Sequence, residues 1–133
     1  LKVDFTENAV EKLKAISQYD EPTYLHQVVA KKTNGEFINF PDLAPATANF
    51  DKKTIQEWRV HYHVPIFTDT YGLLQSTQNE IVKVLSIQKN KPFTQHLEVE
   101  TYTWGVLPAE MQIPLNDSIC REMNWVKKQL DLK

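Results

Sequence analysis

The order of predicted elements in the second half of the chain restricts its fold more than any other feature. Trp58 to Phe67 and Gln95 to Thr103 alternate polar and apolar residues in the manner of β-strands. Amphipathic helices are predicted after the strands, from Thr77 to Lys89 and from about Asp117 to Leu130. Strand, helix, strand, helix is the order of parallel βαβ units. We therefore expect an α/β fold in which the two strands are parallel neighbours.

The two predicted helices have further support in the sequence. Thr77 and Glu80 have the spacing of a capping box, in which each side chain bonds to the backbone at the start of the helix. The last helix has an apolar stripe at helical spacing, and this stripe predicts its buried face. It consists of Ile119, Met123, Val126 and Leu130.

The first half of the chain predicts a helix followed by a β-hairpin. The helix runs from Thr6 to Ser17, and the strands are Tyr24 to Lys32 and Phe37 to Phe40. Asn34-Gly35 lies between the strands, and both residues tolerate the positive φ of a type I′ turn. We predict an antiparallel hairpin with these two residues at the centre of its turn. Prolines end the second strand, and a loop is predicted from Ala46 to Phe50.

Size and charge exclude several classes of protein. A chain of 133 residues predicts a single domain, residues 1–133. Its formal net charge of −2 gives no attraction to nucleic acids or acidic membranes, so we expect neither as a partner. No apolar run approaches the roughly 20 residues that span a bilayer. The single cysteine, Cys120, excludes an internal disulfide and fits a reducing compartment, so a cytoplasmic protein is expected.

Polar side chains share faces on both predicted strands of the second half. His61 and His63 are two residues apart, as are His96, Glu98 and Glu100, and side chains two apart on a strand point to the same side. One interpretation is that these are the solvated faces of half-exposed strands. The other is a polar pocket, because helices that cover a parallel sheet would force the carboxylates to be paired or metal-bound. We favour the pocket.

Two chemistries fit such a pocket. Imidazole and carboxylate together suit a divalent metal such as Zn²⁺ or Mn²⁺. They suit a general acid and base equally well, and His61, His63 and Glu98 are the candidate catalytic residues. The sequence contains no HExxH, CxxC, P-loop or GxGxxG motif to decide between the two.

Four further residues are candidates for binding a ligand: His26, His96, Tyr102 and Trp104. The two aromatic residues directly follow the carboxylates, where they would form the wall of a site for a sugar-like metabolite. The alternative for them is ordinary core packing. The alternative for His26 is a structural histidine whose ring is satisfied by hydrogen bonds.

Several segments resemble a known family. They are Tyr24-Leu25-His26-Gln27-Val28-Val29, Asp42-Leu43, Arg59 to Ile66, Ser76-Thr77-Gln78, His96 to Trp104 (HLEVETYTW) and Leu107-Pro108. With them the chain resembles the C-terminal third of the Ebo-type metabolite-traffic proteins, which belong to the xylose-isomerase-like TIM-barrel superfamily. The stretch from His96 to Trp104 is the most specific part.

The resemblance implies a fold and a site. The fold would be the C-terminal portion of a (β/α)8 TIM barrel, with residues 1–50 as a helix and an inserted hairpin and residues 51–133 as the last two βα units. A typical barrel needs about 250 residues, so the chain would be a fragment. Glu100 and His61 would be ligands of a divalent metal at the C-terminal ends of the barrel strands.

The resemblance also implies a function for the parent protein. The parent would bind a small polar or sugar-like metabolite and isomerise or epimerise it with a metal. The alternative is a non-catalytic metabolite-binding or carrier component, and the sequence leaves open whether the parent is an enzyme. The isolated fragment would be inactive. It would self-associate, because the missing barrel strands would leave one edge of the Trp58–Phe67 or Gln95–Thr103 strand unpaired.

Overall fold

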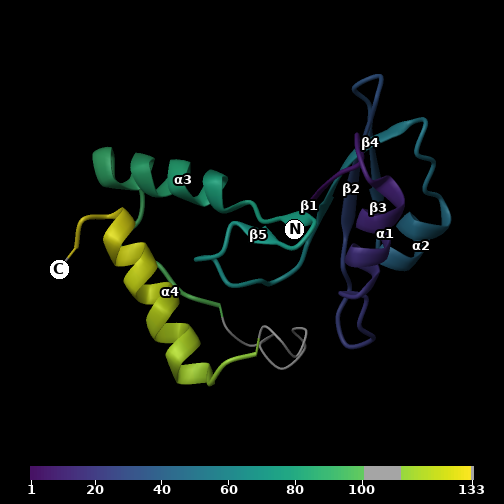
Figure 1. The fold of residues 1–133 in the computed structure, drawn as a ribbon. Helices are drawn as coiled ribbons and strands as arrows, with labels where there is room; N and C mark the ends of the chain where they lie inside the picture. Colours follow the sequence, from purple (N-terminus) through teal and green to yellow (C-terminus); the bar gives the residue numbers. More distant parts are fainter. Residues whose placement is uncertain (101–111, 133) are drawn as a thin grey trace. The chain divides into compact units, whose positions relative to one another are not determined.

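The computed structural model describes residues 1–100 and 112–132, which form two compact units (Figure 1). The sheet unit consists of Leu1–Tyr62 and Thr70–Gln75. The helical unit consists of His63–Asp69 and Ser76–Lys133. In the described part of the chain no helix has both the length and the apolar character needed to cross a membrane.

The sheet unit is built on one six-stranded sheet with the strand order β3-β2-β4-β1-β6-β5. Every pair of neighbouring strands is antiparallel. The strands are β1 (Lys2–Asp4), β2 (Val28–Lys32), β3 (Phe37–Phe40), β4 (Ile55–Val60), β5 (Thr70–Tyr71) and β6 (Leu74–Gln75).

The prediction of a partial TIM barrel is therefore wrong. The sheet is open and antiparallel, and β4 lies between β1 and β2 in the middle of it. Residues 95–100, the described part of the second predicted strand, form no strand. The expected parallel pair and its crossover thus do not exist there. Polar–apolar alternation suits an antiparallel strand with one covered face as well as a barrel strand, and here the partners of β4 come from the first half of the chain.

The predicted hairpin is confirmed, but its turn differs from the expected type. Strands β2 and β3 are antiparallel. The N–H of Gly35 donates to the carbonyl of Lys32 at 3.0 Å, and the N–H of Lys32 donates to the carbonyl of Glu36 at 2.8 Å. The loop is thus Thr33-Asn34-Gly35, a turn followed by a left-handed residue. Gly35 has φ 89°, whereas Asn34 does not have a positive φ, so the type I′ prediction is wrong.

One face of the sheet is buried and carries the core of the sheet unit. Val3, Trp58 and Ala30 lie opposite one another on β1, β4 and β2, and all three are fully buried. Helices α1 (Ala9–Ser17) and α2 (Leu43–Ala48) lie on one side of the sheet (Figure 1). They contribute buried apolar side chains, which are Ile16 from α1 and Leu43 and Ala46 from α2.

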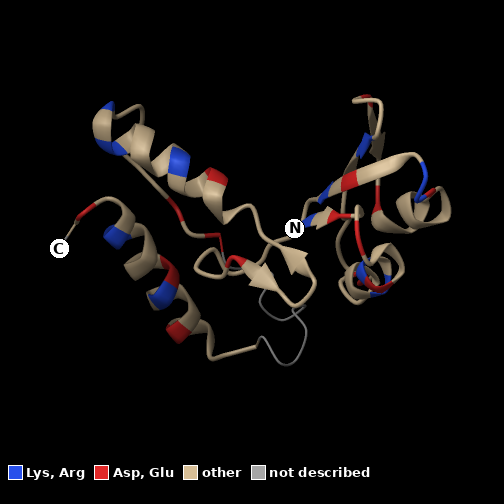
Figure 2. Cartoon of the chain, turned by 45° about the horizontal axis from the view of Figure 1, so that its top comes forward, with Lys and Arg blue, Asp and Glu red and all other residues tan. Residues whose placement is uncertain are grey.

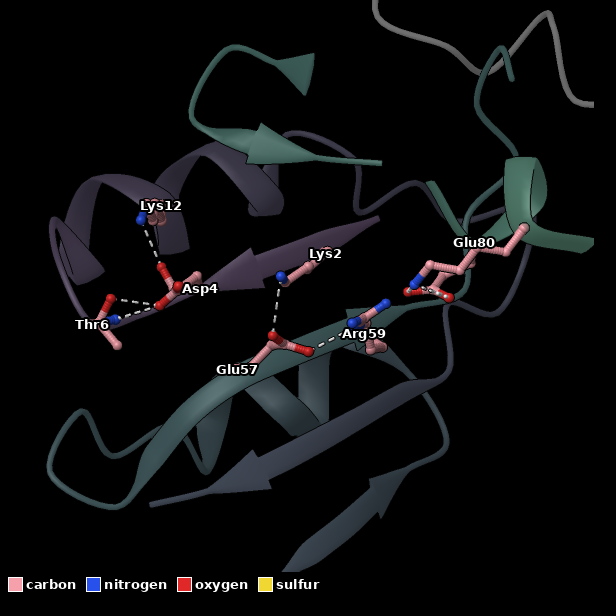
Figure 3. Close-up of polar contacts among 8 residues, drawn as sticks. Lys2, Asp4, Thr6, Lys12, Glu57, Arg59 and Glu80 are labelled. Carbon is pink, nitrogen blue, oxygen red and sulfur yellow. Dashed lines mark hydrogen bonds and ion pairs between the residues drawn. The ribbon is translucent and has the colours of Figure 1, made fainter. Parts of the chain in front are cut away.

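Helix α1 starts later than predicted, because a turn at Asp4 precedes it (Figure 3). The Asp4 carboxylate accepts hydrogen bonds from the backbone N–H and the hydroxyl of Thr6, at 2.9 and 2.7 Å. Asn8 then adopts the left-handed region with φ 51°.

The other face of the sheet is polar: Glu57 pairs there with Lys2 and Arg59 at 3.4 and 2.6 Å.

Helix α2 was not predicted. It includes Pro45 and overlaps the predicted loop from Ala46 to Phe50. Asp42 is its N-cap, and Pro45 is the third residue of the helix. The first four N–H groups of a helix have no intrahelical partner, so proline is tolerated at this position.

The helical unit contains α3 (Gln78–Asn90) and α4 (Leu115–Gln129), so both predicted helices exist. Thr77 makes no capping hydrogen bond, and the Ser76 hydroxyl instead accepts one from the N–H of Gln78 at 3.1 Å. Acidic and basic residues are interspersed along both helices (Figure 2).

The buried face of α4 matches the predicted apolar stripe only in part, since Ile119, Val126 and Leu130 are half-buried. Its buried residues are Ser118 and Glu122, whereas Met123 of the stripe is 46% exposed. Glu122 accepts a hydrogen bond from the N–H of Ile66 at 3.0 Å. This contact turns a polar side of α4 inward.

Candidate functional site

A polar cluster forms in the sheet unit where α1, β2 and α2 meet the loops between them. The loop after α1 is shaped by Glu21, whose carboxylate accepts hydrogen bonds from the N–H groups of Thr23 and Tyr24 at 2.7 and 2.9 Å. Partial burial opposes the ionisation of Glu21, but the hydrogen bonds from Thr23 and Tyr24 outweigh it and lower the pKa of Glu21. The carboxylate is thereby held in place in its charged form.

Asp42 links this loop to α2. One of its carboxylate oxygens, Oδ1, accepts hydrogen bonds from the N–H of Leu43 and from the N–H of His26, each at 2.8 Å. The bond from Leu43 caps the helix, and the bond from His26 fixes the segment that leads into β2. The hydrogen bond from the His26 backbone is the main reason that the pKa of Asp42 is lowered.

The His26 side chain is enclosed between these two carboxylates. The residue is 3% exposed, and its ring stacks on Tyr62 with centroids 4.8 Å apart and an interplanar angle of 17°. Tyr19 also contacts Tyr62, in a T-shaped arrangement with ring centroids 5.1 Å apart. Nε2 of His26 lies 3.7 Å from Glu21 Oε1, and Nδ1 lies 3.7 Å from Asp42 Oδ1. Nδ1 is buried and has no hydrogen-bond partner.

Asp20 completes a set of possible metal ligands. One ligand atom each from Asp20, His26 and Asp42 lies within 4.8 Å of the others. Asp20 is exposed and Asp42 is half-buried, so the cluster extends from the interior to the surface. An imidazole nitrogen with two carboxylates is a donor set found at zinc and other divalent-metal sites.

A pocket opens directly beside the cluster. It has a volume of about 310 Å³ and is lined by Asp20 to Leu25 together with Asp42. We refer to it as the Asp42 pocket. Three of its lining residues are acidic, and no Lys or Arg is among those that the structure describes. Carboxylates accept but do not donate hydrogen bonds, so the pocket suits a cation or a ligand rich in hydroxyl or amino groups.

The structure separates the other predicted site residues. His61 is exposed in the sheet unit, where its Nδ1 lies 3.0 Å from Gln27 Oε1. His63 belongs to the helical unit, because the chain leaves the sheet after β4 ends at Val60. In that unit His63 Nδ1 lies 3.3 Å from Glu100 Oε2, so these two predicted residues are brought together.

The remaining predicted residues contribute no described cluster. His96 and Glu98 are exposed in the segment after α3, where the backbone of His96 is hydrogen-bonded to the hydroxyl of Thr94. Tyr102 and Trp104 lie outside the residues that the structure describes.

Of the sequence candidates, His26 is the one that lies in the polar cluster of the sheet unit, and its acidic neighbours were not predicted. Asp42 before Leu43-Ala44-Pro45 has the signature of a helix N-cap, which is a signal that could have identified it. Asp20 and Glu21 lie between Ser17, where the predicted helix ends, and Pro22, and no motif marks them as site residues. No protein-family model, curated protein or solved structure matches this chain.

Proposed function

We propose that this chain is a non-catalytic binding component for a small polyhydroxylated, sugar-like metabolite, and that the ligand occupies the Asp42 pocket. The observation that carries the proposal is the lining of that pocket. Its three carboxylates, Asp20, Glu21 and Asp42, are acceptors for ligand hydroxyl groups. The exposed Tyr24 and Leu25 supply the apolar side that a sugar ring needs.

The state of two of the carboxylates argues against a role as general acid. A general acid at neutral pH needs a carboxyl group whose pKa is raised. The pKa values of Glu21 and Asp42 are instead lowered, by the hydrogen bonds that they accept from Thr23, Tyr24 and His26. Both groups therefore act as fixed acceptors. The resemblance to metabolite-traffic proteins agrees with a role in carrying a metabolite.

The test is a calorimetric titration of the chain with a panel of aldoses, ketoses and polyols. We expect saturable binding of at least one of them, weakened tenfold or more in Asp20→Asn and in Tyr24→Ala. Asp51→Asn is the matched control, because Asp51 is an exposed aspartate of the same unit that caps a turn outside the pocket. The same mixtures followed by NMR should show no conversion of the sugar.

Two outcomes would contradict the proposal. If no compound of the panel binds, or if Asp20→Asn binds as tightly as the wild type, the pocket is not a sugar site. If a bound sugar is isomerised or epimerised over hours, the chain is an enzyme and the carrier role is wrong.

A further inference from the structure

We propose that Asp20, His26 and Asp42 form a site for one divalent metal ion of the Zn²⁺ or Mn²⁺ class. The proposal goes beyond the binding of a metabolite, because the ion needs only side chains of the protein. It also differs from the metal site implied by the sequence resemblance, which used Glu100 and His61.

The unpartnered nitrogen of His26 is the strongest observation. The side chain is 4% exposed, yet Nδ1 has no hydrogen-bond partner and points to the carboxylate of Asp42 at 3.7 Å. A buried polar atom without a partner is costly and therefore rare in native proteins. A metal ion bound by the Nδ1 lone pair would satisfy it.

The surroundings of His26 prepare this nitrogen for a metal. Nε2 lies 3.7 Å from the Glu21 carboxylate, so this acidic group lies next to the ring nitrogen that would not bind the ion. A carboxylate behind a ligating histidine is the usual outer partner in such sites, where it fixes the tautomer and the ring orientation. Stacking on Tyr62 holds the plane of the ring.

Asp42 has one carboxylate oxygen to spare. Its Oδ1 is occupied by the N–H groups of His26 and Leu43, and these two bonds fix the orientation of the carboxylate. Its second oxygen, Oδ2, takes part in neither of these bonds and is the candidate metal ligand.

The spacing of the three ligands fits after a small adjustment. Their atoms lie within 4.8 Å of one another. Three ligand atoms at about 2.1 Å from one ion stand about 3.4 to 3.6 Å apart, so closure requires a shift of up to about 1.4 Å. Asp20 is exposed and lies in a loop, so it can make this shift.

The test is a titration of the metal-free full chain with Mn²⁺ or Zn²⁺ alone, without any metabolite. We expect one ion per chain, and at least tenfold weaker binding in Asp20→Asn and in Asp42→Asn. Asparagine at position 42 keeps an oxygen that accepts the N–H groups of His26 and Leu43, so this variant should fold. Glu21→Gln should weaken binding about 10-fold or more through the orientation of His26, and Asp51→Asn should bind as the wild type does.

Paramagnetic broadening by Mn²⁺ locates the ion independently of affinity. Amide signals of residues 20–26 and of Leu43 should disappear first. Broadening centred on His63 and Glu100, the absence of saturable binding, or unchanged affinity in Asp42→Asn would each overturn the proposal. The metal result stands apart from the metabolite result: a chain that binds Mn²⁺ but no sugar refutes the proposed function and leaves the metal site intact.

Discussion

Asp42 Oδ1 accepts the backbone N–H of His26 with the same oxygen that caps α2. Residues 16 positions apart are joined by this one atom. The start of β2 and the start of α2 are thus fixed together, and the His26 ring is held between Asp42 and Glu21. The site therefore depends on the same hydrogen bonds that stabilise the fold around it.

Replacing Asp42 with alanine should destabilise the sheet unit by about 2 kcal/mol, since a lost N-cap costs about 1 kcal/mol and a lost hydrogen bond to a charged group costs a similar amount. Asp42→Asn keeps an accepting oxygen and should cost less than half as much. Urea denaturation followed by tryptophan fluorescence measures both, because one of the three tryptophans, Trp58, is buried in the core of the same unit. Equal losses in the two variants would show that Asp42 does not act through these bonds.

Gly35→Val should destabilise the hairpin by about 1–2 kcal/mol, because a β-branched residue resists the left-handed region. Gly35 has φ 89°, and a Cβ placed on it would meet no atom within 4 Å, so the cost is one of backbone conformation and not of space. Gly35→Asn is the matched control and should lose less, since asparagine tolerates this region better. Thermal unfolding of the three proteins gives the comparison, and identical midpoints would argue against the turn described above.

Glu122→Gln should stabilise the helical unit at neutral pH by about 1 kcal/mol, because a buried charge with an unsatisfied oxygen is removed. Burial raises the pKa of Glu122, and the hydrogen bond from Ile66 only partly opposes this. A carboxyl group with a raised pKa binds its proton more tightly in the folded state. Its contribution to stability is therefore present at low pH and is lost as the pH rises from the ordinary carboxyl pKa through the raised value.

The glutamine variant should lack this part of the pH dependence and keep the hydrogen bond to Ile66. Chemical denaturation of both proteins between pH 4 and pH 8 tests the sign. If stability of the wild type rises with pH over this range by more than that of the variant, Glu122 is ionised without cost and the prediction fails.

Self-association, if it occurs through a strand edge, should involve β3. The sequence placed the open edge on Trp58–Phe67 or Gln95–Thr103, but β4 is paired on both sides and β3 is an outer strand. Its four residues, Phe37 to Phe40, carry no charge, and Phe37 is 66% exposed. Edge strands without charges are prone to pair with another chain.

Asn39→Lys adds a charge to this edge and should shift the chain toward the monomer in sedimentation at micromolar concentration. Thr70→Lys on the opposite outer strand, β5, is the control and should leave the distribution unchanged. A wild-type chain that is already monomeric, or dimers that persist in Asn39→Lys, would exclude β3 as the contact.

Local signals in the sequence predicted the hairpin and helices α1, α3 and α4, but they did not predict the pairing between distant segments. Asn34-Gly35 identified the hairpin because a turn depends on neighbouring residues. The strand pattern around Trp58 predicted a strand but could not show that β1, at the other end of the sheet unit's sequence, pairs with it. β1 has only three residues, Lys2 to Asp4, too few for a periodic pattern.

The same distinction explains the site. His26 could be singled out as an isolated histidine in a predicted strand. Its acidic partners come from a loop before it and from a helix cap after the hairpin, and only the fold brings Asp20 and Asp42 together. The spacing of His61 and His63 suggested that they share one face of a strand. The strand β4 ends at Val60, however, before both histidines.

The central claim is that the Asp42 pocket binds a ligand, and amide chemical-shift mapping of the ¹⁵N-labelled chain during titration with the sugar panel tests it most directly. The account predicts that the largest shifts fall on residues 20–26 and on Leu43, whose amides border the pocket or are bonded to its carboxylates. Shifts that instead centre on the segment from His61 to Glu100, or a spectrum that no member of the panel changes, would contradict it.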